Sequence, residues 1–497
     1  MTELTIKSLP DKVRGCWLGK NIGGTLGGPF EGAKVCHDLS FYDPVPDKPL
    51  PNDDLDLQLV WLVMLESLGG REPTLTDFAD AWLRWLRHYP WDEYGICLWN
   101  LESGLRPPIS GCFRNGYIDN MGSPIRSELW ACLSPGDPQG AALLAMKDAI
   151  LDHAGGEGMY GEIFWAAVQS ASFVSDDPQR LIRIGLSMIP LHCRIARVVR
   201  EALLLHERGL TYEDARQKIT TLFASPARQV RTGPWQGRTD GGVVHPCHAV
   251  PNHGFAILGW LYGRDFGDAL CKAVNCGYDT DCTAATLGAT LGILRGADGL
   301  PARWVEPVGT EIVLHKFTGD LPGAPANVDE LTRRVLNLHE RMRGKAADTE
   351  PSRWSNARAH EALRRFDAQS TEVSRGEVSI TLHYYGEPVL YPGERRFVQV
   401  IAAAGGVRCE AKVKLRAPDE WQIEADGAGW WLCAPHGSGR ETTEVTAEID
   451  SRAHTVAFTW LPPSEALWPV EQNVMRCGRC EGRYGACLCD ESIAQGA

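Results

Sequence analysis

Apolar residues along the first two thirds of the chain recur three and four positions apart, which is the spacing of one face of an α-helix. Two such segments begin at Thr74 and Thr211, each followed three positions later by an aspartate, a pattern close to a capping box at a helix start. Runs in which apolar and polar residues alternate are scarce here. The pattern therefore predicts that residues 1–345 form an all-α domain.

The periodicity changes to alternation of apolar and polar residues after Gly376. Short alternating runs are separated by Gly, Pro, Asp and Asn, which is typical of a small β-sandwich, and we expect this accessory domain to span residues 376–470. The polar and charged residues 346–375 are predicted to be a connector, and residues 471–497 form a cysteine-rich tail. The predicted fold class is therefore multidomain, with an all-α bundle followed by a small all-β sandwich-like domain.

The charge balance narrows the range of partners. The chain has 50 Lys and Arg against 63 Asp and Glu, a formal net charge of −13, so a broad basic surface for nucleic acid or anionic membranes is not expected. The N-terminus lacks the apolar segment of a secretory signal, and no apolar run is long enough to span a bilayer. Ten of the 16 cysteines are scattered through the helical part. These features favour a soluble, cytoplasmic protein with reduced thiols, and leave the oligomeric state unknown.

Two groups of carboxylates stand at the starts of predicted helices. Asp53 and Asp54 follow Asn52, whereas Asp279 and Asp281 precede a segment of Ala, Gly and Thr whose small side chains let backbones approach closely. The first group alone has a purely structural explanation, because Asn is a good N-cap and acidic residues favour a helix N-terminus. If both groups converge, four carboxylates need bound cations, and oxygen ligands select Mg²⁺, Mn²⁺ or Ca²⁺.

Five blocks occur in a fixed order along the helical part. They are VRGCWLGKNIGGTLGGPFEG, NDDLDLQLVWL, DNMGSPIR, LDHAGGEGMYGEIFWAA and GYDTDCTAATLGATLGI. Together, over about residues 10–296, they resemble the ADP-ribosylglycohydrolase family. The resemblance implies an all-α bundle with a two-metal magnesium site, and hydrolysis of the bond between ADP-ribose and an acceptor such as arginine or serine.

The resemblance also implies which residues form the metal site. Carried over by position, the carboxylate ligands of two Mg²⁺ or Mn²⁺ ions are Asp53, Asp54, Asp279 and Asp281. The Asn52 amide takes the place of one family threonine, and Thr283 or Asp56 is a candidate substitute where this chain has Cys282 in place of another. Glu31 and Asp54 are the implied catalytic groups, Glu31 because it falls on the acidic residue beside the binuclear centre. Cys282 stands where the family has a threonine, and sulfur is a poor ligand for magnesium, so the affinity or identity of the second metal is open.

A third block implies the substrate-binding residues. The family's glycine-rich loop cradles the ribose and diphosphate, and the matching positions, with a histidine from the next block, are Asn120, Gly122, Arg126 and His153. Ile118 and Pro124 depart from the usual loop composition. A lone Arg or His is also commonly a structural residue, held by an ion pair or by backbone groups.

The tail carries four cysteines within thirteen residues, Cys477, Cys480, Cys487 and Cys489. Two closely spaced pairs of thiols are the ligand set of a structural Zn²⁺ site, and free thiols in a disordered tail are the alternative.

Three functions remain open from the sequence. The first, favoured by the resemblance, is a metal-dependent glycoside hydrolase that cleaves the ribosyl C1″ N- or O-glycosidic bond of an ADP-ribosylated or small-molecule substrate. The second is a hydrolase of another ribosyl, nucleoside-like or sugar metabolite. The third is a non-catalytic protein that binds ADP-ribose or carbohydrate.

Overall fold

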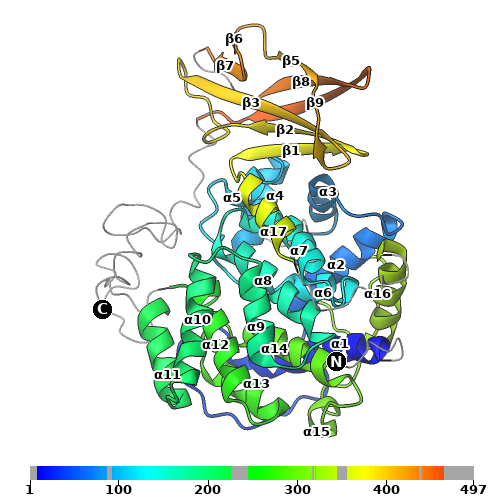
Figure 1. The fold of residues 1–497 in the computed structure, drawn as a ribbon, viewed down its shortest axis with the longest axis vertical. Helices are drawn as coiled ribbons and strands as arrows, with labels where there is room; N and C mark the ends of the chain where they lie inside the picture. Colours follow the sequence, from blue (N-terminus) through cyan, green and yellow to red (C-terminus); the bar gives the residue numbers. More distant parts are fainter. Residues whose placement is uncertain are drawn as a thin grey trace.

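The computed structural model describes residues 8–86, 92–224, 244–315, 318, 321–343, 355–435 and 439–463. A large helical body carries a β-rich region at one end (Figure 1). The helical part and the β-rich part agree with the change of periodicity in the sequence. The four tail cysteines lie outside the described residues, so the zinc prediction stays a prediction. No helix within the described ranges combines the length and the apolar character that crossing a membrane would require.

The helical body has the following elements. Its α-helices are α1 Leu9–Gly27, α2 Asp53–Ser67, α3 Leu75–Trp85, α4 Asp92–Glu102, α5 Ile109–Cys112, α6 Ser127–Leu133, α7 Pro138–His153, α8 Glu157–Ser172, α9 Pro178–Ser187, α10 Arg194–Glu207, α11 Tyr212–Ile219, α12 Ala249–Tyr262, α13 Phe266–Asn275, α14 Thr280–Arg295, α15 Ala302–Val305, α16 Val328–Arg343 and α17 Ala357–Arg365. Short 3₁₀ segments are η1 Gly28–Phe30 and η2 Pro124–Arg126, and η3, Thr220–Ala224, is a π-helical turn.

Helices α1 and α14 pack with their backbones in direct contact. A Cβ atom added to any of four glycines on one face of α1 would come closer than 3.0 Å to a backbone atom of α14: Gly15, Gly19, Gly23 and Gly27. The facing residues of α14 are also small, and they include Gly288 and Gly292. Spacing by four places all four glycines on the same side of the helix. The prediction that the small-residue segment allows close packing is confirmed.

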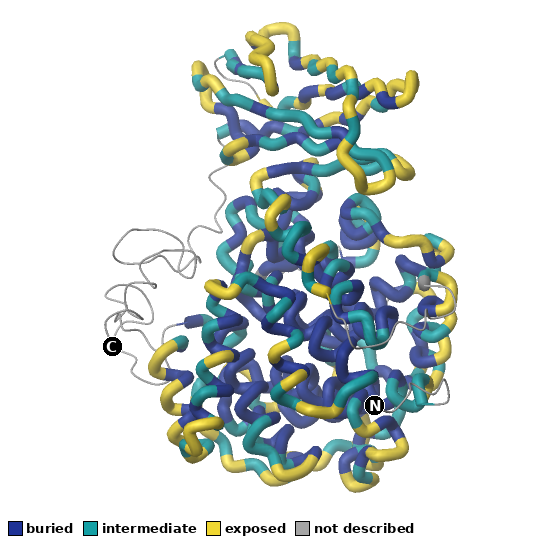
Figure 2. Tube along the Cα trace, viewed as in Figure 1, coloured by how far each residue is buried: buried dark blue, intermediate teal, exposed yellow. Residues whose placement is uncertain are grey.

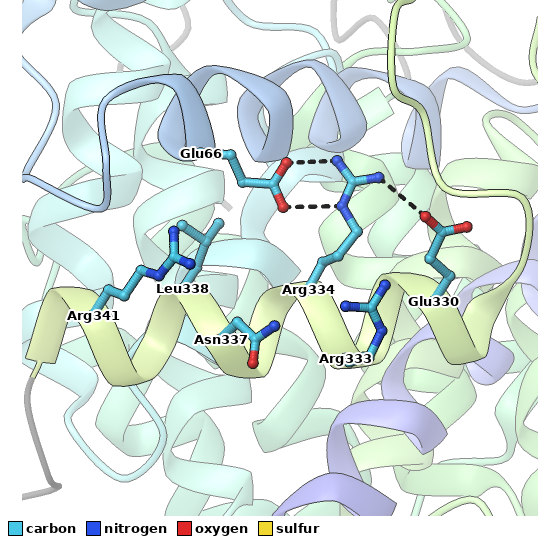
Figure 3. Close-up of a pocket in the computed structure, with 7 residues that line it drawn as sticks. All are labelled: Glu66, Glu330, Arg333, Arg334, Asn337, Leu338 and Arg341. Atoms are coloured by element: carbon cyan, nitrogen blue, oxygen red, sulfur yellow. Dashed lines mark hydrogen bonds and ion pairs between the residues drawn. The ribbon is translucent and has the colours of Figure 1, made fainter.

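Most residues of both helices are buried in the interior of the helical body (Figure 2). The core includes the fully buried tryptophans Trp17, Trp61, Trp82, Trp130 and Trp165. On the outside, α16 is attached to α2 by Arg334, whose Nε and Nη2 donate to the two carboxylate oxygens of Glu66 at 2.9 and 2.6 Å (Figure 3). A cavity of about 320 Å³ lies beside this ion pair, and none of the predicted site residues lines it.

The β-rich region consists of antiparallel strands. They are β1 Ser370–Arg375, β2 Val378–His383, β3 Arg395–Ala404, β4 Val407–Arg408, β5 Lys412–Arg416, β6 Gln422–Asp426, β7 Gly429–Cys433, β8 Glu441–Ile449 and β9 Arg452–Trp460. One sheet has the order β1-β2-β3-β7-β6, with β4 also paired to β3, and the other has the order β5-β8-β9. Both sheets contribute buried side chains to one apolar cluster. The strand-rich character is confirmed, and the sandwich arrangement stays a prediction.

The β-rich region shares its core with the helical body. Leu105, Ile109 and Phe113, which lie at the end of α4 and around α5, belong to the same buried cluster as residues of both sheets. Strand β1 also bonds to this segment, because the Glu372 N–H donates to the Pro107 carbonyl at 2.9 Å. β1 itself lies inside the range predicted as a connector, and so does α17.

The glycine contact generates a prediction about stability. Gly23→Ala places a methyl group against the carbonyl of Ala284, so we expect the free energy of unfolding to fall by about 1–3 kcal/mol, measured by urea denaturation. Gly28→Ala is the matched control, because its Cβ would meet only Leu50 Cδ1 at 3.3 Å. Equal stability of the two variants would show that α1 and α14 can separate without cost.

Candidate active site

Both acidic pairs converge on one region of the helical body. Ligand atoms of Asp54, Asp281 and Cys282 all lie within 4.8 Å of one another, and so do those of Glu31, Asp279 and Cys247. Asp279 and Asp281 are neighbours on the chain, so the two groups adjoin. We call these six residues the acidic cluster. Its carboxylates come from the starts of α2 and α14 and from the turn after η1.

Backbone bonds hold the turn after η1 against the start of α14. The Gly32 N–H donates to the Tyr278 carbonyl, and the Tyr278 N–H donates to the Ala33 carbonyl, both at 2.8 Å. Tyr278 has a φ of 72°, which a non-glycine residue adopts only when its surroundings enforce it. The Thr280 hydroxyl donates to the Gly27 carbonyl at 2.8 Å and completes the junction. Glu31 and Asp279 are therefore brought together by fixed backbone geometry.

Asn52 begins α2 as an N-cap. Its side-chain oxygen accepts the Asp54 N–H at 2.7 Å, which is the structural role that the sequence offered as one explanation. A Cβ on Gly24 would overlap the amide nitrogen of Asn52, so this glycine makes room for the cap. The cap directs the first turn of α2, with Asp53 and Asp54, towards α14.

Burial and mutual repulsion raise the pKa values of the carboxyl groups in the cluster. Burial raises the pKa of Asp54 to about 7, opposed by the neighbouring Lys20 and reinforced by Asp53. Burial, and then the charge of Glu31, raise the pKa values of Asp279 and Asp281 well above the ordinary range. Several carboxylates this close together can all be ionised only if positive charge is added.

Donor atoms of the cluster fit a hard cation in part. Both carboxylate oxygens of Asp279, one of Asp281 and one of Asp54 are buried and accept no N–H or O–H donor among the described residues. Buried oxygens without partners are costly, and a bound cation would satisfy them. Cys247 and Cys282 add sulfur to the donor set. The carboxylates thus suit Mg²⁺ or Mn²⁺, whereas the two sulfur atoms do not.

The other residues assigned to the metal site have these positions. Asp53 is half-buried, and its charge contributes to the raised pKa values of Glu31 and Asp54. The buried hydroxyl of Thr283 donates to the Thr280 carbonyl at 3.2 Å, within α14. Asp56, which the sequence offers as a substitute ligand, instead accepts the His315 N–H at 2.7 Å and the Thr318 hydroxyl. Asp56 therefore anchors the segment before α16.

Lys20 was missed by the sequence analysis and lies beneath the cluster. Its ammonium group is buried and contacts Asp54 Oδ1 at 3.3 Å, Glu128 Oε2 at 3.0 Å and the Ile125 carbonyl at 2.7 Å. Glu128 also accepts a hydrogen bond from Gln58 at 2.8 Å. A charged residue inside the glycine-rich apolar helix α1 was the available signal. Lys20 orients Asp54, so that its Oδ2 is left for a ligand.

The predicted substrate loop lies beside the acidic cluster. The Met121 N–H donates to the Cys247 carbonyl at 2.8 Å, and the Ala249 N–H donates to the Asp119 carbonyl at 2.7 Å. Asn120 is buried and forms a β-bridge with His248. The loop is thereby joined to the segment that carries Cys247, a residue for which the sequence held no signal.

A buried chain of charges supports this loop. Glu93 accepts the Gly122 N–H at 3.1 Å and lies 3.5 Å from His153 Nε2, while His153 Nδ1 lies 3.0 Å from Asp152. Arg126 in turn donates to both oxygens of Asp152, at 2.9 and 2.8 Å. Burial alone would lower the pKa of His153, but Asp152 and Glu93 raise it to about 9.

Arg126 and His153 are both completely buried in this arrangement. Both side chains lie beneath the loop, and their role in substrate binding, which the resemblance implies, stays a prediction. Glu93, which links the loop to this chain of charges, was missed because it lies far from the loop in sequence.

Comparison with known proteins adds a family assignment. The ADP-ribosylglycohydrolase family model matches residues 5–344. A protein of Pseudomonas putida (strain GB-1) named ADP-ribosylarginine hydrolase Tri1 is 39% identical over 334 residues, which cover 66% of this chain and 82% of that protein. An uncharacterized protein of Archaeoglobus fulgidus is 24% identical over 349 residues, covering 67% of this chain and 99% of its own.

One solved structure, described as an ADP-ribosylglycohydrolase-related protein complex, aligns with a TM-score of 0.44 and 18% identity. It covers 68% of this chain and 100% of its own length. The family match to residues 5–344 spans more than half of the chain and contains every residue of the acidic cluster. This chain is therefore a hydrolase that belongs to the ADP-ribosylglycohydrolase family.

Proposed function

We propose that the protein is a metal-dependent hydrolase that cleaves the ribosyl C1″ bond of an ADP-ribosylated substrate, with arginine as the favoured acceptor. The observation that carries the metal dependence is the convergence of Asp54, Asp279 and Asp281 with buried oxygens that lack donors. The acceptor is inferred from the relative named ADP-ribosylarginine hydrolase. The family assignment supports cleavage of a glycosidic bond rather than of another bond.

The metal would be held by the carboxylates of the acidic cluster, and we propose two ions of the Mg²⁺ or Mn²⁺ class as the starting hypothesis. Two adjoining ligand groups support two ions. When held by these carboxylates, such cations would supply an activated water and a fixed orientation of the ribose hydroxyls. Asp53 and Thr283 border the same helix starts and remain candidate ligands.

Glu31 is the residue best placed to move a proton. It is exposed at the edge of the cluster, whereas Asp54, Asp279 and Asp281 are buried. Partial burial of its carboxyl group, and then the charge of Asp53, raise the pKa of Glu31. A carboxyl group with a raised pKa holds a proton closer to neutral pH and can donate it to a leaving group. Asp54, fixed by Lys20, would instead stabilise positive charge on the ribose.

The loop around Asn120 and Gly122 is the proposed substrate-binding surface. Its backbone is fixed on one side by Cys247 and on the other by Glu93. The side chains of Asn120, Arg126 and His153 are all buried within or beneath this loop. A rigid loop beside the acidic cluster would position the ribose without reorganisation.

Replacement of one central carboxylate tests this function. We expect Asp281→Asn to lower the release of ADP-ribose from an arginine-ADP-ribosylated protein at least about 100-fold, because a ligand and a charge are lost together. The metal-free variant should unfold at a higher temperature than the metal-free wild type, since repulsion is relieved. Asp419→Asn, at an exposed position of the β-rich region, is the control. Undiminished turnover after chelation of divalent ions would refute metal dependence.

A second prediction concerns the histidine beneath the loop. The pKa of His153 is about 9 in the folded protein and about 6.5 in an unfolded chain, so its stabilising effect is complete below about pH 6.5. The effect is lost as the pH rises through about 9. Between pH 7 and 9 the wild type should lose up to about 1.4 kcal/mol of unfolding free energy per pH unit more than His153→Gln. Parallel stability curves would mean that His153 is neutral in the folded state.

A further inference from the structure

Each half of the acidic cluster contains a sulfur atom. Cys247 Sγ lies within 4.8 Å of ligand oxygens of Glu31 and Asp279, and Cys282 Sγ lies within 4.8 Å of those of Asp54 and Asp281. We propose that both thiols are metal ligands and that the site prefers a borderline-soft divalent ion of the Zn²⁺ and Co²⁺ class over Mg²⁺. The inference rests on the metal dependence of the proposed function and replaces the Mg²⁺ or Mn²⁺ of its starting hypothesis with a softer ion.

Unpartnered oxygens beside the two sulfur atoms point independently to a ligand. Asp279 is completely buried, and neither of its carboxylate oxygens accepts an N–H or O–H donor from the described residues. Asp54 is also completely buried, and its Oδ2 likewise accepts no N–H or O–H donor from the described residues. Each half of the cluster therefore has at least one such oxygen close to a thiol, which makes a mixed oxygen and sulfur donor set.

Both sulfur atoms are held in place by backbone structure. The Cys247 N–H donates to His245 Nδ1 at 3.3 Å, and its carbonyl accepts the Met121 N–H at 2.8 Å. Cys282 lies in the first turn of α14, one residue after Asp281. Neither thiol needs a change of backbone to reach an ion held by the neighbouring carboxylates.

Three other thiols of the helical body form hydrogen bonds away from this site. Cys97 donates to the Leu151 carbonyl at 3.1 Å, and Cys112 donates to the Ala368 carbonyl at 3.1 Å. Cys193 caps α10 by accepting the Ala196 N–H at 3.4 Å. The two cluster thiols instead face carboxylates, and the Cys282 thiol donates to Asp279.

The binding chemistry separates soft from hard ions. When a sulfur–metal bond forms, the thiol proton is released to solvent, and the thiolate donates an electron pair to the ion. Zn²⁺ and Co²⁺ accept thiolate together with carboxylate ligands, whereas Mg²⁺ gains little from sulfur and requires regular octahedral oxygen ligation. Two sulfur donors therefore raise the affinity for the softer ions selectively.

Cobalt is the probe, because a thiolate bound to Co²⁺ produces a charge-transfer absorption band that oxygen ligands do not. The full chain is stripped of metal, kept reduced, and titrated with Co²⁺ and separately with Mg²⁺.

The variants are Cys247→Ser, Cys282→Ser and the double variant. Cys193→Ser is the matched control, since serine is a preferred N-cap and this buried thiol lies outside the cluster. The absorbance of the band in each variant is compared with that of this control. Absorbance from cobalt bound to other cysteines is present in both and does not affect the difference.

We expect each single variant to lose part of the band, and the double variant to bind Co²⁺ at least tenfold more weakly while its Mg²⁺ affinity is unchanged or higher. Alanine variants repeat the test if a serine variant fails to fold by circular dichroism. An unchanged band in the double variant overturns the inference. If Mg²⁺ then supports turnover, the proposed function stands without thiol ligation. If no divalent ion binds or supports turnover, both the inference and the metal-dependent function fail.

Discussion

The backbone contact between α1 and α14 is the constraint on which the site depends. Gly19 and Gly23 lie against the backbone of α14, and the Thr280 hydroxyl reaches the carbonyl of Gly27 where the two helices meet the cluster. Contact this close fixes the position of Asp279 and Asp281 relative to the turn that carries Glu31. Larger side chains at these glycines would move one half of the cluster away from the other.

This rigidity explains how the protein tolerates several buried acids in a small volume. Lys20 neutralises part of the charge from below, and its contacts with Asp54 and Glu128 link the cluster to the core. Burial and the charge of Glu31 still raise the pKa values of Asp279 and Asp281. The packing of the helical body therefore supplies the free energy that keeps these groups together, and a cation would reduce that cost.

The sequence predicted the helical body, the strand-rich region and the family, because periodicity and ordered motifs are local signals. It also pointed to Asp54, Asp279 and Asp281, which the structure brings together at the starts of two helices and whose role as metal ligands stays a prediction. It could not identify Cys247 or Glu93, since their roles depend on tertiary contacts between distant segments. The alternation of apolar and polar residues along the strands also did not indicate that Leu105 and Phe113 of the helical body belong to the core of the β-rich region.

The distance along the chain between the two central helices has a consequence for synthesis. Gly27 and Thr280 are hydrogen-bonded although 253 residues separate them. During translation, α1 leaves the ribosome long before α14 exists, so its glycine-lined face has no partner for most of that time. Contacts between distant segments form late and slow the search for the native state. The acidic cluster should therefore be among the last parts of the helical body to assemble, whichever helices fold first.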